Sequence, residues 1–185
     1  MRIGLIADTH IPRDAKMLPP HVKVAFNGVD LILHAGDIYV SDVLDELEAI
    51  APVIAALGNG DRELPRDHRV EDSHTLNIDG LKVGLTHAFD LNVPLRTFEN
   101  AMEREFGGTV DVVVSGDTHI AVVERYKGVL LVNPGSPTLP NGLFELGTVG
   151  MLEIAEGKVS ARIVRLCEFQ LAFQRELVYR KGFGA

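Results

Sequence analysis

The chain has 185 residues, of which 46% are hydrophobic and 24% charged, and its formal net charge is −8 at pH 7. This composition is typical of a globular protein, and the length favours one domain with a sizeable core. The negative charge disfavours binding to nucleic-acid polymers, which requires a basic surface. No stretch reaches the roughly 18 apolar residues of a membrane span, and the N-terminus lacks a secretory signal pattern. Cys167 is the one cysteine, which excludes an intrachain disulfide and favours a reducing compartment, so we expect a soluble cytoplasmic protein.

The first predicted element is a strand buried on both faces, from Ile3 to Ala7. It is followed by Asp8 and His10, two residues apart, whose side chains would share one side of an extended backbone. In open α/β sheets, ligands bind at the carboxyl ends of strands. An oxygen donor beside a nitrogen donor suits Mn, Fe, Zn or Ni. The alternative is that Asp8 caps the next helix and His10 lies on a loop.

Residues 11–20 form a predicted loop, and Pro20 favours the start of a short helix that runs to Phe26 and ends at Gly28. Arg13 lies in this loop, near the first strand end. It is a candidate contact for an anionic substrate, and the alternative is a solvated loop arginine.

Two further units of strand and polar loop follow. Asp30–His34 is predicted as a buried strand that leads to Asp37. Ser41 is predicted to cap a helix that runs to Ile50. Pro52–Leu57 is predicted as the third strand, and Asn59 follows it between two glycines. Glycine on both sides allows close approach of the backbone to a ligand, although Asn-Gly is also a common turn sequence.

Beyond this point the pattern changes to hairpins. Alternating apolar residues predict strands over Thr75–Ile78 and Leu81–Thr86, joined at Asp79-Gly80 by a type I′ turn. The second of these strands ends at His87. This histidine is therefore a further donor at a strand end.

A helix is predicted from Pro94 to Phe106, closed by two glycines, and a buried strand from Val110 to Ser115. Asp117 and His119 follow that strand. Further hairpins are predicted over 122–132 and 149–166. Residues 169–180 have apolar side chains four apart, which predicts an amphipathic helix that docks on the body of the protein or on a second copy.

Five predicted strand ends thus carry side chains with metal-binding oxygen or nitrogen atoms. Convergence of these ends would place two metal ions within reach of a shared carboxylate, although each short motif also occurs by chance. The residues are Asp8, His10, Asp37, Asn59, His87, Asp117 and His119.

In order and spacing, these motifs resemble those of the calcineurin-like metallophosphoesterases, in particular the small prokaryotic phosphodiesterase branch. The resemblance covers residues 1 to about 165. The matching segments are Asp8-Thr9-His10, Gly36-Asp37, Gly58-Asn59-Gly60-Asp61, His87, Gly116-Asp117-Thr118-His119 and the turn Asn133-Pro134-Gly135-Ser136.

The resemblance implies an α/β (α+β) fold, a four-layer αββα sandwich in which two mixed β-sheets lie face to face with helices outside. We expect a single domain over 1–185, with a core at 1–166 and a C-terminal amphipathic segment at 167–185 that docks on the body or, in a homo-oligomer, on a second copy.

The resemblance also implies two divalent metal ions, with Mn favoured over Fe, Zn or Ni. It assigns one ion to Asp8, His10, Asp37 and His119, and the other to Asp37, Asn59, His87 and Asp117. Asp37 would bridge the two ions, and a hydroxide between them would attack phosphorus. Asp37 and Asn59 are the implied catalytic residues. Asn59 is also an expected substrate contact, and Arg13 is a candidate contact from its place in the loop alone.

Two positions depart from the family pattern. Asp117 stands where the family usually has histidine, and its negative charge should favour harder ions such as Mn. Gly60 stands where some members carry a histidine that protonates the leaving group, and Asp61 beside it is only a candidate for a partial replacement. His34 and Asp61 are also candidates for supporting the ligands, the alternatives being a core histidine and a turn aspartate.

The resemblance therefore predicts a metal-dependent phosphodiesterase that acts on a small phosphate ester. A phosphomonoesterase or nucleotidase with the same metals is one alternative. The other is a non-catalytic scaffold, since the retromer scaffold subunit resembles this family in fold and binds partners.

Overall fold

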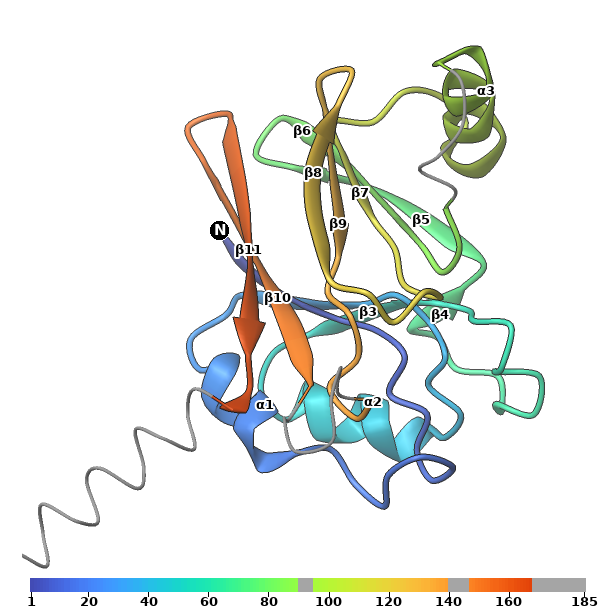
Figure 1. The fold of residues 1–185 in the computed structure, drawn as a ribbon, viewed down its shortest axis with the longest axis vertical. Coiled ribbons are helices and arrows are strands. Elements are labelled where there is room, and N and C mark those ends of the chain that lie inside the picture. The colour runs from blue at the N-terminus through green and yellow to red at the C-terminus, as the bar shows by residue number, and fades with distance from the viewer. Residues whose placement is uncertain (90–94, 140–146, 168–185) are drawn as a thin grey trace, which may run out of the picture.

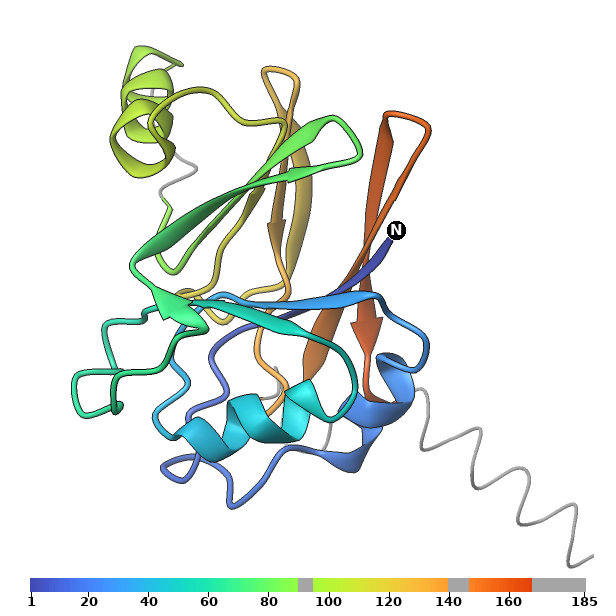
Figure 2. The same ribbon diagram turned by 180° about the vertical axis from the view of Figure 1, so that it is seen from behind.

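The computed structural model describes residues 1–89, 95–139 and 147–167. It confirms the expected four-layer αββα sandwich, with two mixed sheets packed face to face and helices on their outer faces (Figures 1 and 2). The predicted segment 169–180 and the predicted helix start at Pro94 lie outside the described residues. Within the described part of the chain, no helix is long and apolar enough to cross a membrane.

The first sheet has six strands in the order β11-β10-β1-β2-β3-β4. The strands β1 to β4 run parallel, and β10 pairs antiparallel with β1 and β11. The strand β4 was not predicted because two residues are too short to show a hydrophobic period. The bounds are β1 (Arg2–Ile6), β2 (Leu31–His34), β3 (Val53–Ala56), β4 (Val70–Glu71), β10 (Thr148–Ala155) and β11 (Lys158–Arg165).

The second sheet has five strands in the order β5-β6-β7-β9-β8, of which β6, β7 and β9 are parallel. The hairpin β5–β6 turns at Asp79 and Gly80, whose φ angles of 49° and 83° fit the predicted type I′ turn. The bounds are β5 (Ser73–Ile78), β6 (Leu81–Thr86), β7 (Val112–Val114), β8 (Val122–Tyr126) and β9 (Val129–Asn133).

Helices α1 (Pro20–Ala25) and α2 (Ser41–Glu48) cover the first sheet, and α3 (Leu95–Phe106) covers the second (Figure 1). The predicted cap at Ser41 is wrong. The backbone is still extended at Val40, which is the N-cap residue, so Ser41 already belongs to the first turn and makes no capping hydrogen bond. The helix also ends at Glu48, two residues before the predicted end.

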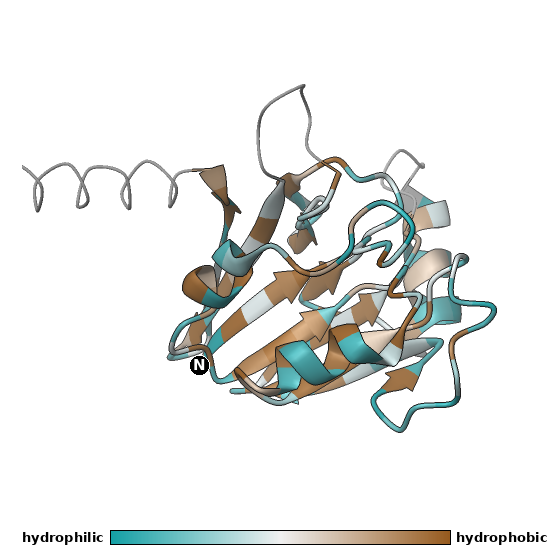
Figure 3. Cartoon of the chain, turned by 90° about the horizontal axis from the view of Figure 1, so that it is seen from below, coloured by the Kyte–Doolittle hydropathy of each residue, from teal (hydrophilic) through white to brown (hydrophobic). Residues whose placement is uncertain are grey.

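Apolar side chains fill three layers of core, and Figure 3 shows hydrophobic residues concentrated along the strands, with hydrophilic residues on loops and outer helix faces. The layer between the sheets determines how far apart the two sheets lie, and therefore how far apart the polar loops at their strand ends lie. It includes Ile3, Leu5, Leu31, Leu33, Val83, Leu85, Val112, Val114, Leu130 and Val132.

Ion pairs around the buried side chain of Arg69 hold the segment before β4 against α2. The Arg69 guanidinium lies 2.6 Å from Asp67, 2.7 Å from Asp45 and 2.8 Å from Glu48. The Arg69 side chain is only 7% exposed. Hydrogen bonds from Arg69 lower the pKa of Asp67 from 3.8 to about 2.

We expect Asp67→Asn to lower the free energy of unfolding by about 2 kcal/mol at pH 6. Because the folded-state pKa of Asp67 is lowered, its carboxylate stabilises the protein above its ordinary pKa of 3.8, and this stabilisation is lost as the pH falls towards 2. Urea unfolding of the wild type and the variant should therefore show roughly half the difference at pH 3. A difference that is the same at both pH values would contradict this role.

Candidate metal centre

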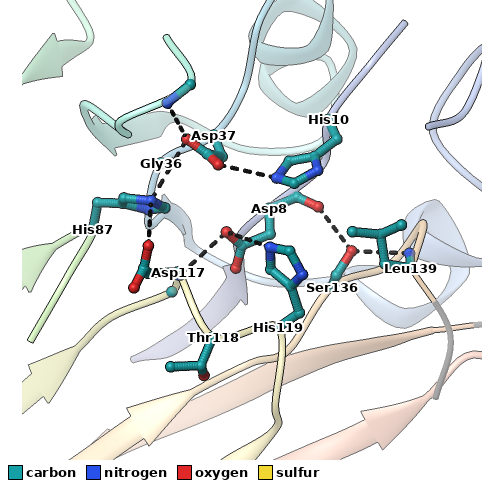
Figure 4. A network of polar contacts seen from close by, with 12 residues as sticks. Asp8, His10, Gly36, Asp37, His87, Asp117, Thr118, His119, Ser136 and Leu139 are labelled. Atoms are coloured by element: carbon teal, nitrogen blue, oxygen red, sulfur yellow. Dashed lines mark hydrogen bonds and ion pairs between the residues drawn. The ribbon is translucent and has the colours of Figure 1, made fainter. Parts of the chain in front are cut away.

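The side chains singled out at the five strand ends lie together at one edge of the sandwich. Figure 4 shows those of Asp8, His10, Asp37, His87, Asp117 and His119 around a common centre. They follow β1, β2 and β3 in the first sheet and β6 and β7 in the second. The edge where the two sheets meet therefore brings together residues more than a hundred positions apart in the sequence.

Asp37 lies at the middle of the cluster. Its Oδ2 is 3.0 Å from Nε2 of His10, and its Oδ1 is 3.5 Å from Nε2 of His87. Oδ1 also accepts a hydrogen bond of 2.7 Å from the backbone N–H of Gly60. The two carboxylate oxygens thus face different imidazoles, as a bridging ligand requires.

Asp117 and Asn59 lie on the solvent side of the cluster, and both are exposed. Oδ1 of Asp117 is 3.6 Å from Nε2 of His87 and accepts a hydrogen bond of 3.2 Å from Nδ2 of Asn59. The carboxylate at position 117 therefore reaches the same centre as His87.

Asp8 and His119 complete the cluster from the first and second sheets. Nε2 of His119 is 3.7 Å from Oδ1 of Asp8. The potential ligand atoms form two groups, and within each group all atoms lie within 4.8 Å of one another. Asp8 belongs to both groups. They are Asp8, His10 and His119, and Asp8, Asp37 and His87.

The hydrogen bonds of His87 define which ring nitrogen is free. Its Nδ1 lies 2.8 Å from the carbonyl oxygen of Ala35, so Nδ1 carries the hydrogen and donates it. A neutral imidazole then presents the lone pair of Nε2, which is buried and has no hydrogen-bond partner in the described part of the chain. That lone pair faces the carboxylates of Asp37 and Asp117. Such an arrangement is unfavourable unless a cation lies between them, so it fits a metal site.

His10 has a similar arrangement. Its Nδ1 lies 2.7 Å from a carboxylate oxygen of Asp14, and its Nε2 lies 3.0 Å from Oδ2 of Asp37. Carboxylate partners of this kind orient metal-binding imidazoles. Asp14 was missed by the sequence analysis, and its position four residues after His10 was the available signal.

Charge repulsion and burial dominate the electrostatics of Asp8, whose side chain is fully buried. Burial, together with the nearby Asp37 and Asp117 carboxylates, raises its pKa to about 8, against the lowering effect of the Asp117 backbone N–H. Oδ2 of Asp8 is buried without a hydrogen-bond partner among the described residues. A divalent cation would offset both the repulsion and the missing partner, so the residues present fit the group.

Five of the candidate ligands have a left-handed backbone, with φ between 48° and 69°. Non-glycine residues adopt this conformation at a cost of the order of 1–3 kcal/mol each, and they cluster at functional sites. Backbone hydrogen bonds from Asp8 to Gly36 and from His10 to Asp37 hold two of them in place. The five are Asp8, His10, Asp37, Asp117 and His119.

The two candidate supporting residues lie behind the candidate ligands. His34 is fully buried, and burial lowers its pKa to about 3, so its ring is neutral. Nδ1 of His34 accepts the Gly36 N–H at 3.2 Å, and Nε2 lies 3.2 Å from the Thr9 hydroxyl. Asp61 accepts backbone hydrogen bonds from the loop that carries Asp37. Both residues thus join neighbouring loops, and neither is the direct partner of a candidate metal-binding imidazole.

Ser136, in the predicted turn, joins the site from the loop after β9. Its hydroxyl donates to the carbonyl oxygen of Asp8 at 2.7 Å and accepts the backbone N–H of Leu139 at 3.0 Å (Figure 4). Arg13 lies at the outer side of the cluster with a side chain that is 70% exposed, and it donates to the Tyr39 hydroxyl at 3.3 Å.

Two mixed sheets between helices, with carboxylates and imidazoles gathered at the carboxyl ends of their strands, define the class of metallophosphoesterase folds. Residues 1–157 match the calcineurin-like phosphoesterase superfamily domain, and the chain belongs to this superfamily.

Two relatives agree with this assignment. A probable metallophosphoesterase of Methanothermobacter thermautotrophicus is 39% identical over 169 residues, which are 89% of this chain and 92% of the relative. A phosphodiesterase of Methanocaldococcus jannaschii is 30% identical over 168 residues, covering 83% of this chain and 93% of the relative.

Solved structures agree with the fold. A structure described as a novel archaeal phosphodiesterase has a TM-score of 0.62 at 27% identity and covers 89% of this chain and 100% of its own. Vps29 of Entamoeba histolytica, complexed with Zn²⁺, has a TM-score of 0.66 at 22% identity and covers 90% and 99%. The likeness to Vps29 concerns the fold alone.

Proposed function

We propose that the protein is a phosphodiesterase that uses two divalent metal ions to hydrolyse a small phosphate diester. The observation that carries the proposal is the pair of overlapping ligand groups around Asp8 and Asp37, together with the buried, unpartnered Nε2 of His87 that faces two carboxylates. The phosphodiesterase relatives support a diester rather than a monoester as substrate.

The proposed ligands divide into two sets that share Asp37. His10 and His119 belong to the first set and His87 and Asn59 to the second, while Asp8 lies close enough to contribute to either. Asp117 contributes a carboxylate to the second set in place of the usual histidine. A site with this many oxygen donors favours Mn over softer ions.

Two bound dications would supply Lewis acidity, lowering the pKa of water and offsetting charge on the phosphoryl oxygens. The chain itself orients the ligands through Asp14, Ala35 and Asp61. Asn59 adds a neutral oxygen or N–H at the exposed side, where it can contact the ester. Arg13 adds a positive charge to the same rim, which suits an anionic substrate.

Hydrolysis of bis(para-nitrophenyl) phosphate by the purified protein tests this proposal. We expect turnover with added Mn²⁺, none after removal of metal with a chelator, and slower turnover of para-nitrophenyl phosphate. Faster hydrolysis of the monoester would favour a phosphomonoesterase. If neither ester were hydrolysed with any divalent cation, this result would contradict an enzymatic function and favour a scaffold of the same fold.

Metal binding should also be visible as a gain in stability. Because Mn²⁺ would relieve the repulsion among Asp8, Asp37 and Asp117 in the folded protein only, we expect about 2.7 kcal/mol of stabilisation at 100 times the dissociation constant. Thermal unfolding with Mn²⁺ and with chelator measures this effect. An equal melting temperature in both conditions would contradict a metal site.

A further inference from the structure

Tyr39 has a backbone conformation that aromatic residues rarely adopt. Its φ is 76°, in the left-handed region, where a bulky side chain is a genuine outlier. The Tyr39 N–H donates to Oδ1 of Asp61 at 2.8 Å, which holds the residue in this conformation. Strain that is maintained by a buried carboxylate beside a candidate metal centre points to a role for the side chain that it positions.

The side chain of Tyr39 lies against the candidate metal centre. Its ring stacks on the imidazole of His10, with centroids 5.0 Å apart and planes within 7° of parallel. The ring also occupies the space beside Gly60, because a Cβ added at Gly60 would lie 2.7 Å from the Tyr39 hydroxyl oxygen. Gly60 itself donates its N–H to Asp37. The phenol therefore fills the place where a side chain at position 60 would stand, next to the proposed bridging ligand.

The hydrogen bonding of Tyr39 leaves one donor free. Arg13 donates to the hydroxyl oxygen at 3.3 Å, so Tyr39 is the acceptor in that bond. A tyrosine hydroxyl carries one hydrogen of its own, and among the described residues no acceptor for it is found. The positive guanidinium also polarises the O–H bond and strengthens it as a donor.

We propose that Tyr39 is a catalytic residue whose hydroxyl donates a hydrogen bond to the leaving-group oxygen of the substrate diester, with Arg13 as its positioning residue. The inference rests on the proposed function. In hydrolysis, a bond forms between phosphorus and the attacking water oxygen and the bond to the leaving alcohol breaks, with its electron pair moving to the alcohol oxygen. Tyr39 stabilises the charge that develops on this oxygen. The attacking water gives up its proton to solvent, and the released alcohol takes its proton from solvent.

The test compares two substrates that differ in the leaving group only, methyl para-nitrophenyl phosphate and methyl phenyl phosphate. Phenoxide is the poorer leaving group and needs more stabilisation. We expect Tyr39→Phe to lower kcat for the phenyl ester on the order of 10- to 100-fold, and for the para-nitrophenyl ester by less than about threefold. The matched control is Tyr126→Phe, which removes the hydroxyl of a tyrosine that packs on Phe98, away from the site.

Mn²⁺ affinity, measured by calorimetry, separates a substrate contact from a structural effect. Tyr39→Phe keeps the ring on His10, so the affinity should equal that of the wild type. Gly60→Ala should displace the ring and reproduce the leaving-group dependence of Tyr39→Phe. An equal loss for both esters, or reduced Mn²⁺ affinity in Tyr39→Phe, would overturn the role of Tyr39 while leaving the phosphodiesterase intact. A wild type that hydrolyses neither ester would overturn both proposals.

Discussion

Replacement of Asp37 by asparagine is expected to abolish metal-dependent hydrolysis, with a loss of at least the order of 10³-fold in kcat/KM, or about 4 kcal/mol of transition-state stabilisation. Each oxygen of Asp37 faces a different imidazole, so one carboxylate serves both proposed metal ions. Asparagine has a single neutral oxygen and cannot bridge two cations. It can still accept the N–H of Gly60, so the fold should persist.

Steady-state kinetics with bis(para-nitrophenyl) phosphate and the Mn²⁺ content of the purified variant measure this loss together. The matched control is Asp42→Asn, which removes an exposed carboxylate from the first turn of α2. Two bound Mn²⁺ ions per chain in Asp37→Asn, with turnover like the wild type, would show that Asp37 does not bridge.

The proposed ligands could be chosen from the sequence because each of them follows an apolar run. A run such as Ile3–Ala7 has no charge, so the first polar side chains after it mark the point where the chain leaves the core. The turn at Asp79-Gly80 was predictable for a related reason, since few sequences tolerate two consecutive positive φ angles.

The convergence of the ligands was not predictable from such runs. A strand pattern gives no information on which strands are neighbours, and here Asp8 and Asp37 come from one sheet while His87 and Asp117 come from the other. Only the resemblance to a known family implied that two sheets meet at this edge. The sharing of Asp8 between both ligand groups is a further detail that depends on side-chain directions.

Residues whose roles depend on one specific contact were missed for a different reason. Tyr39 looks like an ordinary core aromatic in the sequence, because its left-handed conformation depends on a hydrogen bond to Asp61, 22 residues away. Likewise, Asp14 is one acidic residue in a polar loop until its contact with His10 is known. Single-residue contacts of this kind leave no periodic signal.

The Asp61 carboxylate should affect metal binding as strongly as a proposed ligand does, although it contacts backbone N–H groups rather than a metal ion. It is 3% exposed and accepts four backbone N–H groups, two on each oxygen. Three of these come from the loop that carries the proposed bridging residue and one from the next loop. The donors are Asp37 at 3.0 Å, Ile38 at 2.7 Å, Tyr39 at 2.8 Å and Gly58 at 2.8 Å.

We expect Asp61→Asn to lower the free energy of unfolding by about 3 kcal/mol and the Mn²⁺ affinity on the order of 10- to 100-fold. Asparagine has the shape of aspartate, but its NH₂ group would point at two backbone N–H donors, so one pair of hydrogen bonds is replaced by repulsion. The loop at Asp37 would then lose the restraint that holds its left-handed backbone. Urea unfolding and calorimetric titration with Mn²⁺ measure the two effects.

Asp67→Asn is the matched control, since it removes a largely buried carboxylate that pairs with Arg69, which also binds Asp45 and Glu48 of α2. It should lower stability without changing Mn²⁺ affinity, because Arg69 contacts none of the proposed ligands. If Asp61→Asn lost stability but kept the Mn²⁺ affinity of the wild type, then the loops would position the ligands without Asp61. Loss of both stability and Mn²⁺ affinity would show that Asp61, which contacts no metal ion itself, holds Asp37 and Asn59 where they can bind the same pair of ions.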